Sequence, residues 1–278
     1  MDAVYIASPH PFHERQALAA IAANKAVLCE KPIAMTLSEA ERIVQAARTA
    51  GVFLMEAFMY RCHPLLREAR ELLLAGAIGE IVHVNAQFGF RVDRNPSGRL
   101  FAPELGGGAI LDVGGYPASF ARLVGGIRAG QPFAEPVAIS ATGRLGPTGV
   151  DELAVAQLVF ASGMTAEIGC ATRHSLGTQC VVYGEKGRLE LPNPWLPRDD
   201  RLGLDTDLHL FRDGHEPERR VVHTALTTYA IEAQLVADTL PALQPATPAM
   251  TWDDTLGNMR LLQAWSDAVR ASANSHSL

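Results

Sequence analysis

Two short segments of this 278-residue chain combine residue types that could do chemistry. The first is Glu30-Lys31-Pro32, which follows the apolar residues 26–29. A short apolar run is typical of a buried strand, and open α/β sheets bind ligands just outside the carboxyl ends of their strands. Pro32 fixes the following turn and favours an extended conformation of Lys31. Position alone fits a ligand-binding lysine and a solvated surface lysine equally well.

The second segment, LDVGGYP, places Asp112 and Tyr116 four residues apart and therefore on one face of a helix. Gly114, Gly115 and Pro117 are poor helix formers, and Pro117 should kink the helix. Small residues beside Tyr116 would let a ligand or a cofactor ring approach closely. The alternative is an ordinary helix start, with Tyr116 packed at a domain seam. The glycines favour the functional interpretation.

Other polar and aromatic residues carry weaker signals. His10 and His13 are three residues apart, but a third ligand is not near them in the sequence, so we expect no metal site. Arg61 follows the third apolar segment and could reach the same crevice, although a structural role fits it equally well. Phe88 and Phe90 alternate with polar or small residues, so they should share one face of a strand as core or as a pocket wall.

The bulk composition excludes several classes of protein. Hydrophobic residues make up 48% of the chain, which is enough for a packed core, and the net charge of −6 argues against nucleic-acid binding. No apolar stretch approaches the ~20 residues that cross a bilayer, and the first residues lack the pattern of a signal peptide. The four cysteines form no C-x-x-C pair. We therefore expect a cytoplasmic protein that binds neither nucleic acid nor a membrane.

The elements that must position these residues begin with a β-α-β-α-β pattern. Three apolar segments are predicted strands and the two segments between them are predicted helices: residues 2–7, 11–24, 26–29, 36–50 and 52–58. Thr36 and Glu39 have the spacing of a capping box, and Gly51 lies where that helix should end. Short buried strands that alternate with helices indicate a parallel, doubly wound sheet.

The pattern changes after residue 60. Helices are predicted over residues 64–76, 106–126, 227–241 and 251–271, and strands over residues 80–90, 137–145, 152–161, 164–173 and 178–191. A proline-rich loop is predicted over residues 192–207, where long loops are often functional. Several strands separated by glycine-rich turns indicate a large, mostly antiparallel sheet.

Three segments together resemble the Gfo/Idh/MocA family of NAD(P)-dependent oxidoreductases. They are residues 2–32, which end in CEKP, residues 53–64, which contain AFMYRCHP, and residues 105–117, which contain LDVGGYP. The branch of dimeric dihydrodiol dehydrogenase and NADP-dependent xylose 1-dehydrogenase is most similar. The resemblance implies a partial Rossmann domain over residues 1–60 and a C-terminal α/β domain over residues 61–278. We expect helix 251–271 to pack back on the Rossmann part.

The resemblance also implies roles for individual residues. Lys31 would lie beside the nicotinamide of NADP or NAD, and Tyr116 would act as general base on an aldose or cyclic diol while hydride leaves the carbinol carbon. The Lys31 ammonium would favour the phenolate, and Asp112 would orient Tyr116 or a substrate hydroxyl. Cofactor contacts are implied for Ser8, Pro9, His13, Glu30, Lys31 and Pro32, and substrate contacts for Met59, Arg61 and Phe90.

One part of the family pattern is not found. The chain has no glycine between Met1 and Ala50, so the first βαβ unit lacks the G-x-G-x-x-G turn that holds dinucleotide phosphates. In the family pattern that turn would precede residue 1. We therefore expect this form to bind NAD(P) weakly or not at all, with impaired activity. Two alternatives stay open: a non-catalytic sugar-binding or oligomer-partner relative, and a glycosidase that uses NAD as a transient hydride store. A homodimer or higher homo-oligomer through the C-terminal sheet is expected.

Overall fold

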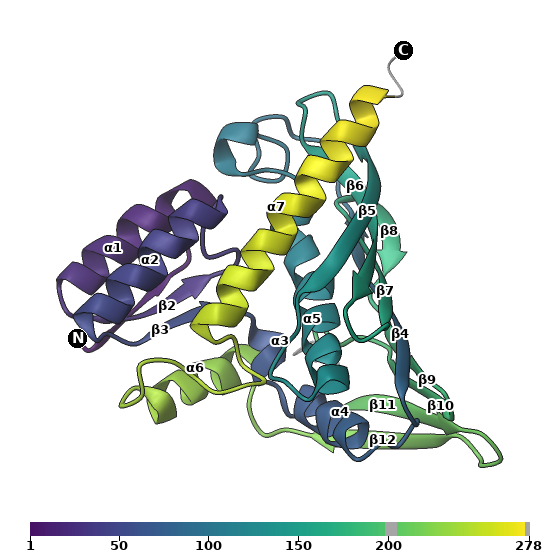
Figure 1. Ribbon diagram of the computed structural model, residues 1–278. Helices are drawn as coiled ribbons and strands as arrows, with labels where there is room; N and C mark the ends of the chain where they lie inside the picture. Colours follow the sequence, from purple (N-terminus) through teal and green to yellow (C-terminus); the bar gives the residue numbers. More distant parts are fainter. Residues whose placement is uncertain (198–204, 276–278) are drawn as a thin grey trace.

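The computed structural model describes residues 1–197 and 205–275, which form two sheets (Figure 1). The smaller sheet contains three parallel strands in the order β1-β2-β3. Its elements are β1 (Ala3–Ile6), η1 (His10–Phe12), α1 (His13–Ala22), β2 (Ala26–Glu30), α2 (Leu37–Ala50) and β3 (Leu54–Ala57). The predicted β-α-β-α-β unit is therefore confirmed.

Local sequence signals determine where α2 begins and ends. The Thr36 side chain accepts the Glu39 N–H, and the Glu39 carboxylate accepts the Thr36 N–H, so the predicted capping box forms. Gly51 ends the helix in the left-handed conformation, with φ of 63°. Helices α1 and α2 lie together on one face of the smaller sheet (Figure 1).

The C-terminal part of the chain returns to cover the second face of the smaller sheet. Helix α6 (Thr228–Thr239) packs there through an apolar cluster. Its buried members are Ala26, Leu28, Phe53, Met55, Ala57 and Val236. The indole of Trp252 donates to the Leu54 carbonyl over 3.0 Å, and the Leu54 N–H donates to the Leu243 carbonyl over 3.1 Å. Helix α7 (Trp252–Ser275) runs past α2 and continues along β5 of the larger sheet.

The larger sheet has nine strands within the described residues, in the order β12-β11-β10-β9-β4-β7-β6-β5, with β8 paired to β4. Strands β4 and β7 are parallel, and the other pairs are antiparallel. The strands are β4 (Ile81–Arg91), β5 (Pro136–Leu145), β6 (Asp151–Phe160), β7 (Thr165–Ala171), β8 (Arg173–Gly177), β9 (Cys180–Gly184), β10 (Gly187–Leu191), β11 (Asp205–Arg212) and β12 (Glu218–His223).

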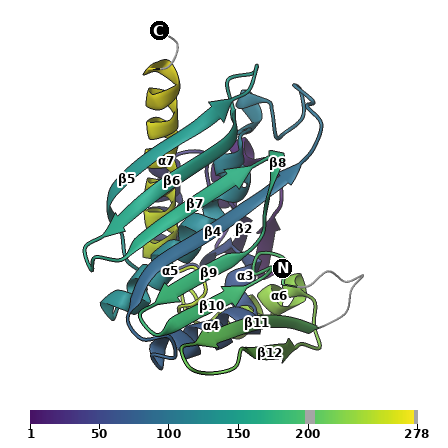
Figure 2. The same ribbon diagram turned by 90° about the vertical axis from the view of Figure 1, so that its right-hand side faces the viewer.

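Helices cover only one face of this sheet. Helix α4 (Pro64–Leu74), α5 (Gly115–Ala129) and α7 pack against it, and the short α3 (Met59–Cys62) connects β3 to α4. Figure 2 shows the opposite face, over which no described helix lies. The prediction of a large, mostly antiparallel sheet is confirmed.

Some predicted boundaries in this region are wrong. Residues 164–173 and 178–191 each contain two strands instead of one, and residues 205–207 of the predicted loop belong to β11. Strand β12 has no counterpart among the predicted strands because its sequence, ERRVVH, begins with three charged residues. The Arg219 and Arg220 side chains pair with Asp207 and Glu68, which lets charged residues occupy an edge strand. Residues 198–204 of the predicted loop lie outside the described residues.

The helix that contains Tyr116 starts irregularly. A π-helical turn, η3 (Ile110–Gly114), precedes α5, and Pro117 occupies the third position of α5. Proline has no N–H to offer to the Val113 carbonyl, so the backbone cannot keep α-helical bonding through this turn. The irregularity expected at Pro117 therefore appears immediately before it, at the turn that carries Asp112.

A buried ion network joins helices α3, α5 and α7. The Asp254 carboxylate, on α7, accepts from Arg61 of α3 over 2.7 Å and from Arg122 of α5. All three side chains have no exposed surface. Arg61 also donates to the carbonyls of Ser119 and Pro248, and Arg122 bonds Glu135. Three helices that are distant in sequence are therefore fixed to one carboxylate.

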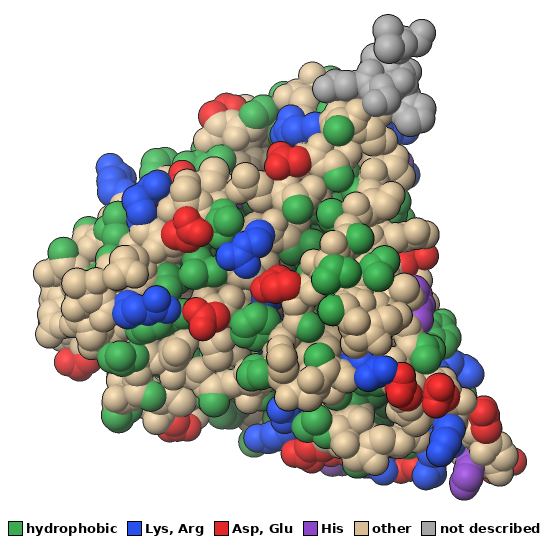
Figure 3. All heavy atoms as spheres, in the orientation of Figure 1, with side chains coloured by type: hydrophobic (Ala, Val, Ile, Leu, Met, Phe, Trp, Pro, Cys, Tyr) green, Lys and Arg blue, Asp and Glu red, His purple; other side chains and the backbone are tan. Residues whose placement is uncertain are grey.

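The surface and the helices give two further observations. Within the described residues, no helix is long and apolar enough to cross a membrane. On the face shown in Figure 3, acidic and basic side chains are interspersed.

Replacing Asp254 by alanine should strongly destabilise the protein. The change leaves two buried guanidinium groups without their shared counter-ion, which costs about 3–5 kcal/mol in the free energy of unfolding. Asp253→Ala is the matched control, since its side chain is 76% exposed and should change stability little. Urea denaturation of both variants measures the difference, and equal midpoints would contradict a supporting role for the network.

Candidate active site

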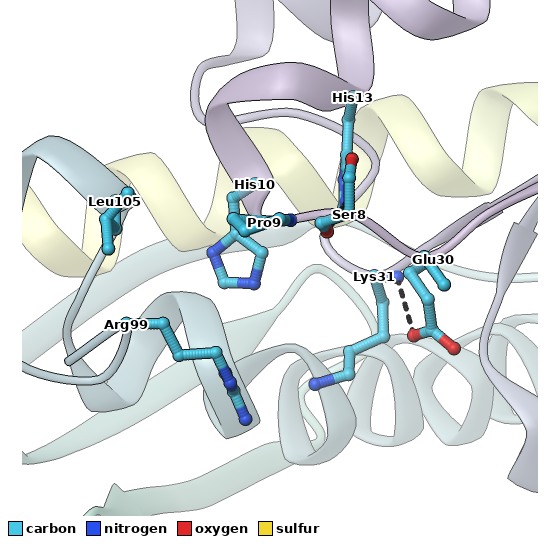
Figure 4. Close-up of a pocket in the computed structure, with 9 residues that line it drawn as sticks. Ser8, Pro9, His10, His13, Glu30, Lys31, Arg99 and Leu105 are labelled. Atoms are coloured by element: carbon cyan, nitrogen blue, oxygen red, sulfur yellow. Dashed lines mark hydrogen bonds between the residues drawn. The ribbon is translucent and has the colours of Figure 1, made fainter.

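A pocket of about 320 Å³ lies at the carboxyl ends of β1 and β2 (Figure 4). In Figure 4 the side chains of His10, Lys31 and Arg99 converge on the same space. The residues that line the pocket are Ala7, Ser8, Pro9, His10, His13, Glu30, Lys31, Arg99 and Leu105. Most belong to the first βαβ unit, and the last two come from the loop after β4. The pocket thus occupies the position at which open α/β sheets bind ligands.

Lys31 connects the two segments that the sequence analysis singled out. Its Nζ donates to the Asp112 carbonyl oxygen over 2.6 Å and lies 3.7 Å from Asp112 Oδ1. The same ammonium lies 5.3 Å from the ring centroid of Tyr116. The structure therefore brings Lys31, Asp112 and Tyr116 together beside the pocket.

The Asp112 carboxylate is buried but stays ionised. Arg99 Nη1 donates to its Oδ1 over 2.7 Å. Burial alone would raise the pKa of Asp112, but the neighbouring cations Lys31 and Arg99 outweigh burial, so the pKa lies below its usual value. The carboxylate therefore holds two cations at the edge of the pocket.

The Tyr116 phenol is buried and protonated. Its hydroxyl donates to Met59 Sδ over 3.4 Å, a weak acceptor. Burial, followed by the nearby Glu30 carboxylate, raises the pKa of Tyr116 well above its usual value. Burial and the Glu30 charge disfavour the phenolate that Lys31 was expected to favour. The arrangement instead suits a phenol that donates its proton.

An aromatic cluster fixes the Tyr116 ring. Phe58 and Phe88 meet it edge-on with centroids 5.2 Å away, and Tyr60 and Trp195 lie within 5.6 and 5.9 Å. Trp195 is fully buried, and its indole donates to the Gln87 carbonyl over 2.7 Å. Sequence reasoning missed Trp195, for which the only signal was a tryptophan in a proline-rich loop.

The two histidines differ in their contacts. The His13 ring is fully buried, with Nδ1 2.9 Å from the Pro32 carbonyl and Nε2 2.7 Å from the Ser8 carbonyl. It therefore joins the turn after β1 to the turn after β2. His10 Nδ1 lies 3.2 Å from the Gly106 carbonyl. Burial, and secondarily Lys31, lowers the pKa of His10 to about 4, so this ring is neutral. No group of three potential metal ligands occurs within the described residues.

The other residues implied by the family resemblance divide into two groups. Ser8, Pro9 and Glu30 line the pocket, and Met59 contacts the Tyr116 hydroxyl. Arg61 lies in the buried ion network described above, and Phe90 packs edge-on against Phe88 with ring centroids 6.3 Å apart. Six of the predicted site residues are not among those that line the pocket: Pro32, Met59, Arg61, Phe90, Asp112 and Tyr116.

The space beside Gly114 and Gly115 is filled by side chains of the protein itself. A Cβ on Gly115 would lie 2.8 Å from the Phe58 ring, and one on Gly114 would lie 3.2 Å from the Trp265 ring. Close packing of these rings, rather than approach of a ligand, explains the small residues.

Asp151 of β6 anchors the start of the Tyr116 helix and was missed from sequence. Its Oδ2 accepts the Ile110 N–H over 2.7 Å. Gly108 has φ of 121°, and a Cβ there would lie 2.4 Å from Asp151 Oδ1, so only glycine leaves room for this carboxylate. Burial raises the pKa of Asp151 to about 6.

Glu56 of β3 supports the turn that follows Lys31 and was also missed. Its Oε1 accepts the Ile33 N–H over 3.0 Å, and its side chain is 1% exposed. Burial raises the pKa of Glu56 to about 7, although the bonds from Ile33 and Thr255 oppose this shift. Its signal in the sequence was a charged residue inside an apolar strand.

Comparison with known proteins decides the family. The profile of the GFO/IDH/MocA C-terminal domain matches residues 66–190, and the profile of the oxidoreductase family with an NAD-binding Rossmann fold matches residues 1–58. Rabbit (Oryctolagus cuniculus) trans-1,2-dihydrobenzene-1,2-diol dehydrogenase is 34% identical over 86% of this chain and 70% of its own length. The chain belongs to the Gfo/Idh/MocA family. The mouse (Mus musculus) enzyme of the same name is 35% identical over 72% of this chain, and the match spans 57% of that enzyme.

Solved structures of Gfo/Idh/MocA-like oxidoreductases share the fold. An aldose-aldose oxidoreductase from Caulobacter crescentus, complexed with glycerol, superposes with a TM-score of 0.83 at 25% identity, over 98% of this chain and 78% of that one. A 3-ketoreductase from Actinomadura kijaniata, in complex with NADP and TDP-benzene, gives a TM-score of 0.81 at 28% identity, over 98% and 78%.

Replacing Glu56 by glutamine should remove part of the pH dependence of stability. The folded state holds the Glu56 proton up to a pH of about 7, whereas an unfolded glutamate releases it near 4.5, so wild-type stability falls as the pH rises between these values. Glutamine can still accept the Ile33 N–H but does not ionise. The stability difference between variant and wild type should therefore shift by about 3 kcal/mol in favour of the variant across this range.

Urea denaturation at a series of pH values measures this difference. Glu71→Gln, at an exposed position of α4, is the matched control and should follow the wild type. If the free energies of unfolding of Glu56→Gln and the wild type changed with pH in the same way, a buried, titrating Glu56 would be contradicted.

Proposed function

We propose that this protein is an NAD(P)-dependent oxidoreductase that acts on a CH–OH group of an aldose or a cyclic diol. The observation that carries the proposal is the Lys31 ammonium, held by Asp112 beside the Tyr116 ring at the carboxyl ends of two parallel strands. The names of the relatives support this substrate range, since they include a dihydrodiol dehydrogenase and an aldose-aldose oxidoreductase.

The pocket fits the nicotinamide end of a dinucleotide. Its volume of about 320 Å³ accommodates a small planar ring, and its walls combine the apolar Pro9 and Leu105 with polar groups. Ser8, Pro9, Glu30 and Lys31 would hold that ring, while His13 braces the Ser8 and Pro32 turns from behind. When bound, the nicotinamide supplies the hydride donor or acceptor.

The residues of this chain supply proton transfer and charge stabilisation. Tyr116 carries a proton and would donate it to the oxygen of a carbonyl as that oxygen gains negative charge. The Lys31 ammonium would stabilise the same developing charge, and Asp112 keeps Lys31 in place. In the oxidation direction Tyr116 would take the hydroxyl proton.

A non-catalytic relative that binds sugars is the second candidate, because residues 1–50 contain no glycine to form a phosphate-binding turn. Titration of the protein with NADPH, followed by its fluorescence, separates the two. We expect weak binding at millimolar concentrations together with slow turnover, and binding without any turnover would favour the second candidate. Saturable micromolar binding would contradict the expected weakness.

The uncovered face of the larger sheet supports a homodimer or a higher homo-oligomer. Val159, Tyr183 and Val221 are exposed there although they are large and apolar, which is typical of an interface. The four cysteines are unpaired, which is typical of a reducing compartment, and we therefore place the protein in the cytoplasm.

Tyr116→Phe should lower turnover by about 100- to 10,000-fold at saturating NADPH, because only the hydroxyl that transfers the proton is lost. The dissociation constant of NADPH should stay unchanged. Tyr183→Phe, on the larger sheet, is the matched control and should keep wild-type turnover. Steady-state kinetics with a xylose or cyclohexanediol probe measures both variants, and unchanged turnover of Tyr116→Phe would rule out this assignment.

A further inference from the structure

The imidazole of His10 presents to the pocket a nitrogen atom that the mechanism does not use. His10 begins η1, shortly after β1; the residue is 8% exposed and lines the pocket. Its Nδ1 faces the Gly106 carbonyl, whereas its Nε2 has no hydrogen-bond partner among the described residues. In Figure 4 this second nitrogen points into the space between Arg99 and Lys31. A polar atom of a largely buried residue that is aimed into a cavity is a candidate contact for a ligand.

The contact with Gly106 determines which nitrogen of His10 carries the ring proton. A carbonyl oxygen only accepts hydrogen bonds, so Nδ1 must donate its proton to Gly106, over 3.2 Å. The ring is neutral, as described above, and a neutral imidazole carries one proton, so the lone pair is on Nε2. An ordinary histidine would also be neutral above a pH of about 6.5. His10 Nε2 is therefore a hydrogen-bond acceptor.

Two neighbours hold the His10 ring in this orientation. Gly106 has φ of 71°, and a Cβ there would lie 3.1 Å from His10 Nδ1, so glycine lets the loop approach the ring closely. The buried His13 ring meets the His10 ring edge-on, with ring centroids 5.7 Å apart. The lone pair of Nε2 thus has a fixed direction, as a group that recognises a ligand requires.

Arg99 supplies hydrogen-bond donors on the same side of the pocket. Its Nη1 donates to Asp112 Oδ1, and the side chain is 55% exposed. A guanidinium has five N–H donors, and no other hydrogen bond of this one occurs among the described residues. The other N–H groups of Arg99 are therefore available to a ligand. Figure 4 shows His10 and Arg99 on one side of Lys31 and Glu30 on the other.

We propose that His10 and Arg99 bind the hydroxyl group next to the reacting carbon of an α-hydroxy carbonyl compound or a vicinal diol, with His10 as the specificity-determining residue. This hydroxyl donates to His10 Nε2 and accepts from Arg99, so both of its hydrogen-bonding roles are used. A compound without the hydroxyl leaves the acceptor and the donor unpaired in the pocket, which weakens its binding. The inference rests on the proposed function, which places the reacting oxygen beside Lys31.

The test uses two probes that differ by one hydroxyl group, trans-1,2-cyclohexanediol and cyclohexanol. Both are titrated into the full chain by NMR, with and without NADP⁺, and their oxidation is followed. The wild type should bind and oxidise the diol at least about 10-fold better than cyclohexanol. His10→Phe keeps a ring but removes the acceptor, so it should weaken diol binding by about 5- to 100-fold and leave cyclohexanol binding unchanged.

Two further variants control for a loss of structure. His10→Gln carries an amide oxygen that can accept a hydrogen bond, so it should restore part of the preference for the diol. His215→Phe, at the exposed turn between β11 and β12, is the matched control and should behave as the wild type. Thermal unfolding of each variant shows whether it is folded.

Nitrogen NMR of the histidine-labelled wild type gives a second readout that a structural role would not produce. The His10 signals are those that disappear in His10→Gln. Binding of the diol should shift the His10 Nε2 resonance, because its lone pair then accepts a hydrogen bond, and cyclohexanol should leave it unchanged. If His10→Phe does not fold, this shift and the preference of the wild type decide the outcome.

The outcomes separate this inference from the proposed function. Diol binding that depends on His10, without any turnover, would sustain the recognition site and contradict the oxidoreductase proposal. Turnover with equal wild-type affinities for the two probes, or with an unchanged preference in a folded His10→Phe, would overturn the recognition site alone. A His10→Phe variant that weakens only NADP⁺ binding would also overturn it, because Nε2 would then contact the cofactor. Absence of diol binding by the wild type at high concentration would have the same consequence.

Discussion

The contact between Lys31 and Asp112 is the interaction on which the site depends. It joins the turn after β2 to the π-helical turn before α5, across 81 residues of sequence. Other buried side chains hold the turn that carries each partner. Glu56 and His13 hold the turn on the lysine side, whereas Asp151 holds the start of η3 on the other side. The position of the ammonium beside the pocket is therefore a property of both units together.

Burial sets the protonation states around this contact. Two cations keep Asp112 ionised, while buried carboxyls with fewer cationic neighbours, such as Glu56, have a pKa near neutrality. Tyr116 belongs to the second group, because burial and Glu30 keep its phenol protonated. The balance of desolvation and local charge thus decides which of these groups are anions and which keep their proton.

Local sequence patterns were sufficient to predict the first unit and to single out two segments that the structure brings together. Glu30-Lys31-Pro32 and LDVGGYP have short-range signatures, and the capping box of α2 depends on residues three apart. Trp195 and Asp151 lie far along the chain from Tyr116, and only the tertiary fold brings them near it, so no spacing rule could find them. The glycines near Tyr116 were interpreted as space for a ligand for the same reason. The rings that fill this space, Phe58 and Trp265, are distant in sequence.

Transfer of deuterium from carbinol-deuterated xylose or cyclohexanediol to NADP⁺, followed by mass spectrometry, is the most direct test of the catalytic role of Lys31. The wild type should label the nicotinamide. Lys31→Met should transfer deuterium at least about 100-fold more slowly at saturating cofactor, because the charge beside the reacting oxygen is lost. Lys186→Met, at an exposed turn, should match the wild type. Equal transfer by Lys31→Met and the wild type, or none by a wild type that binds NADP⁺ and the deuterated probe, would contradict this role.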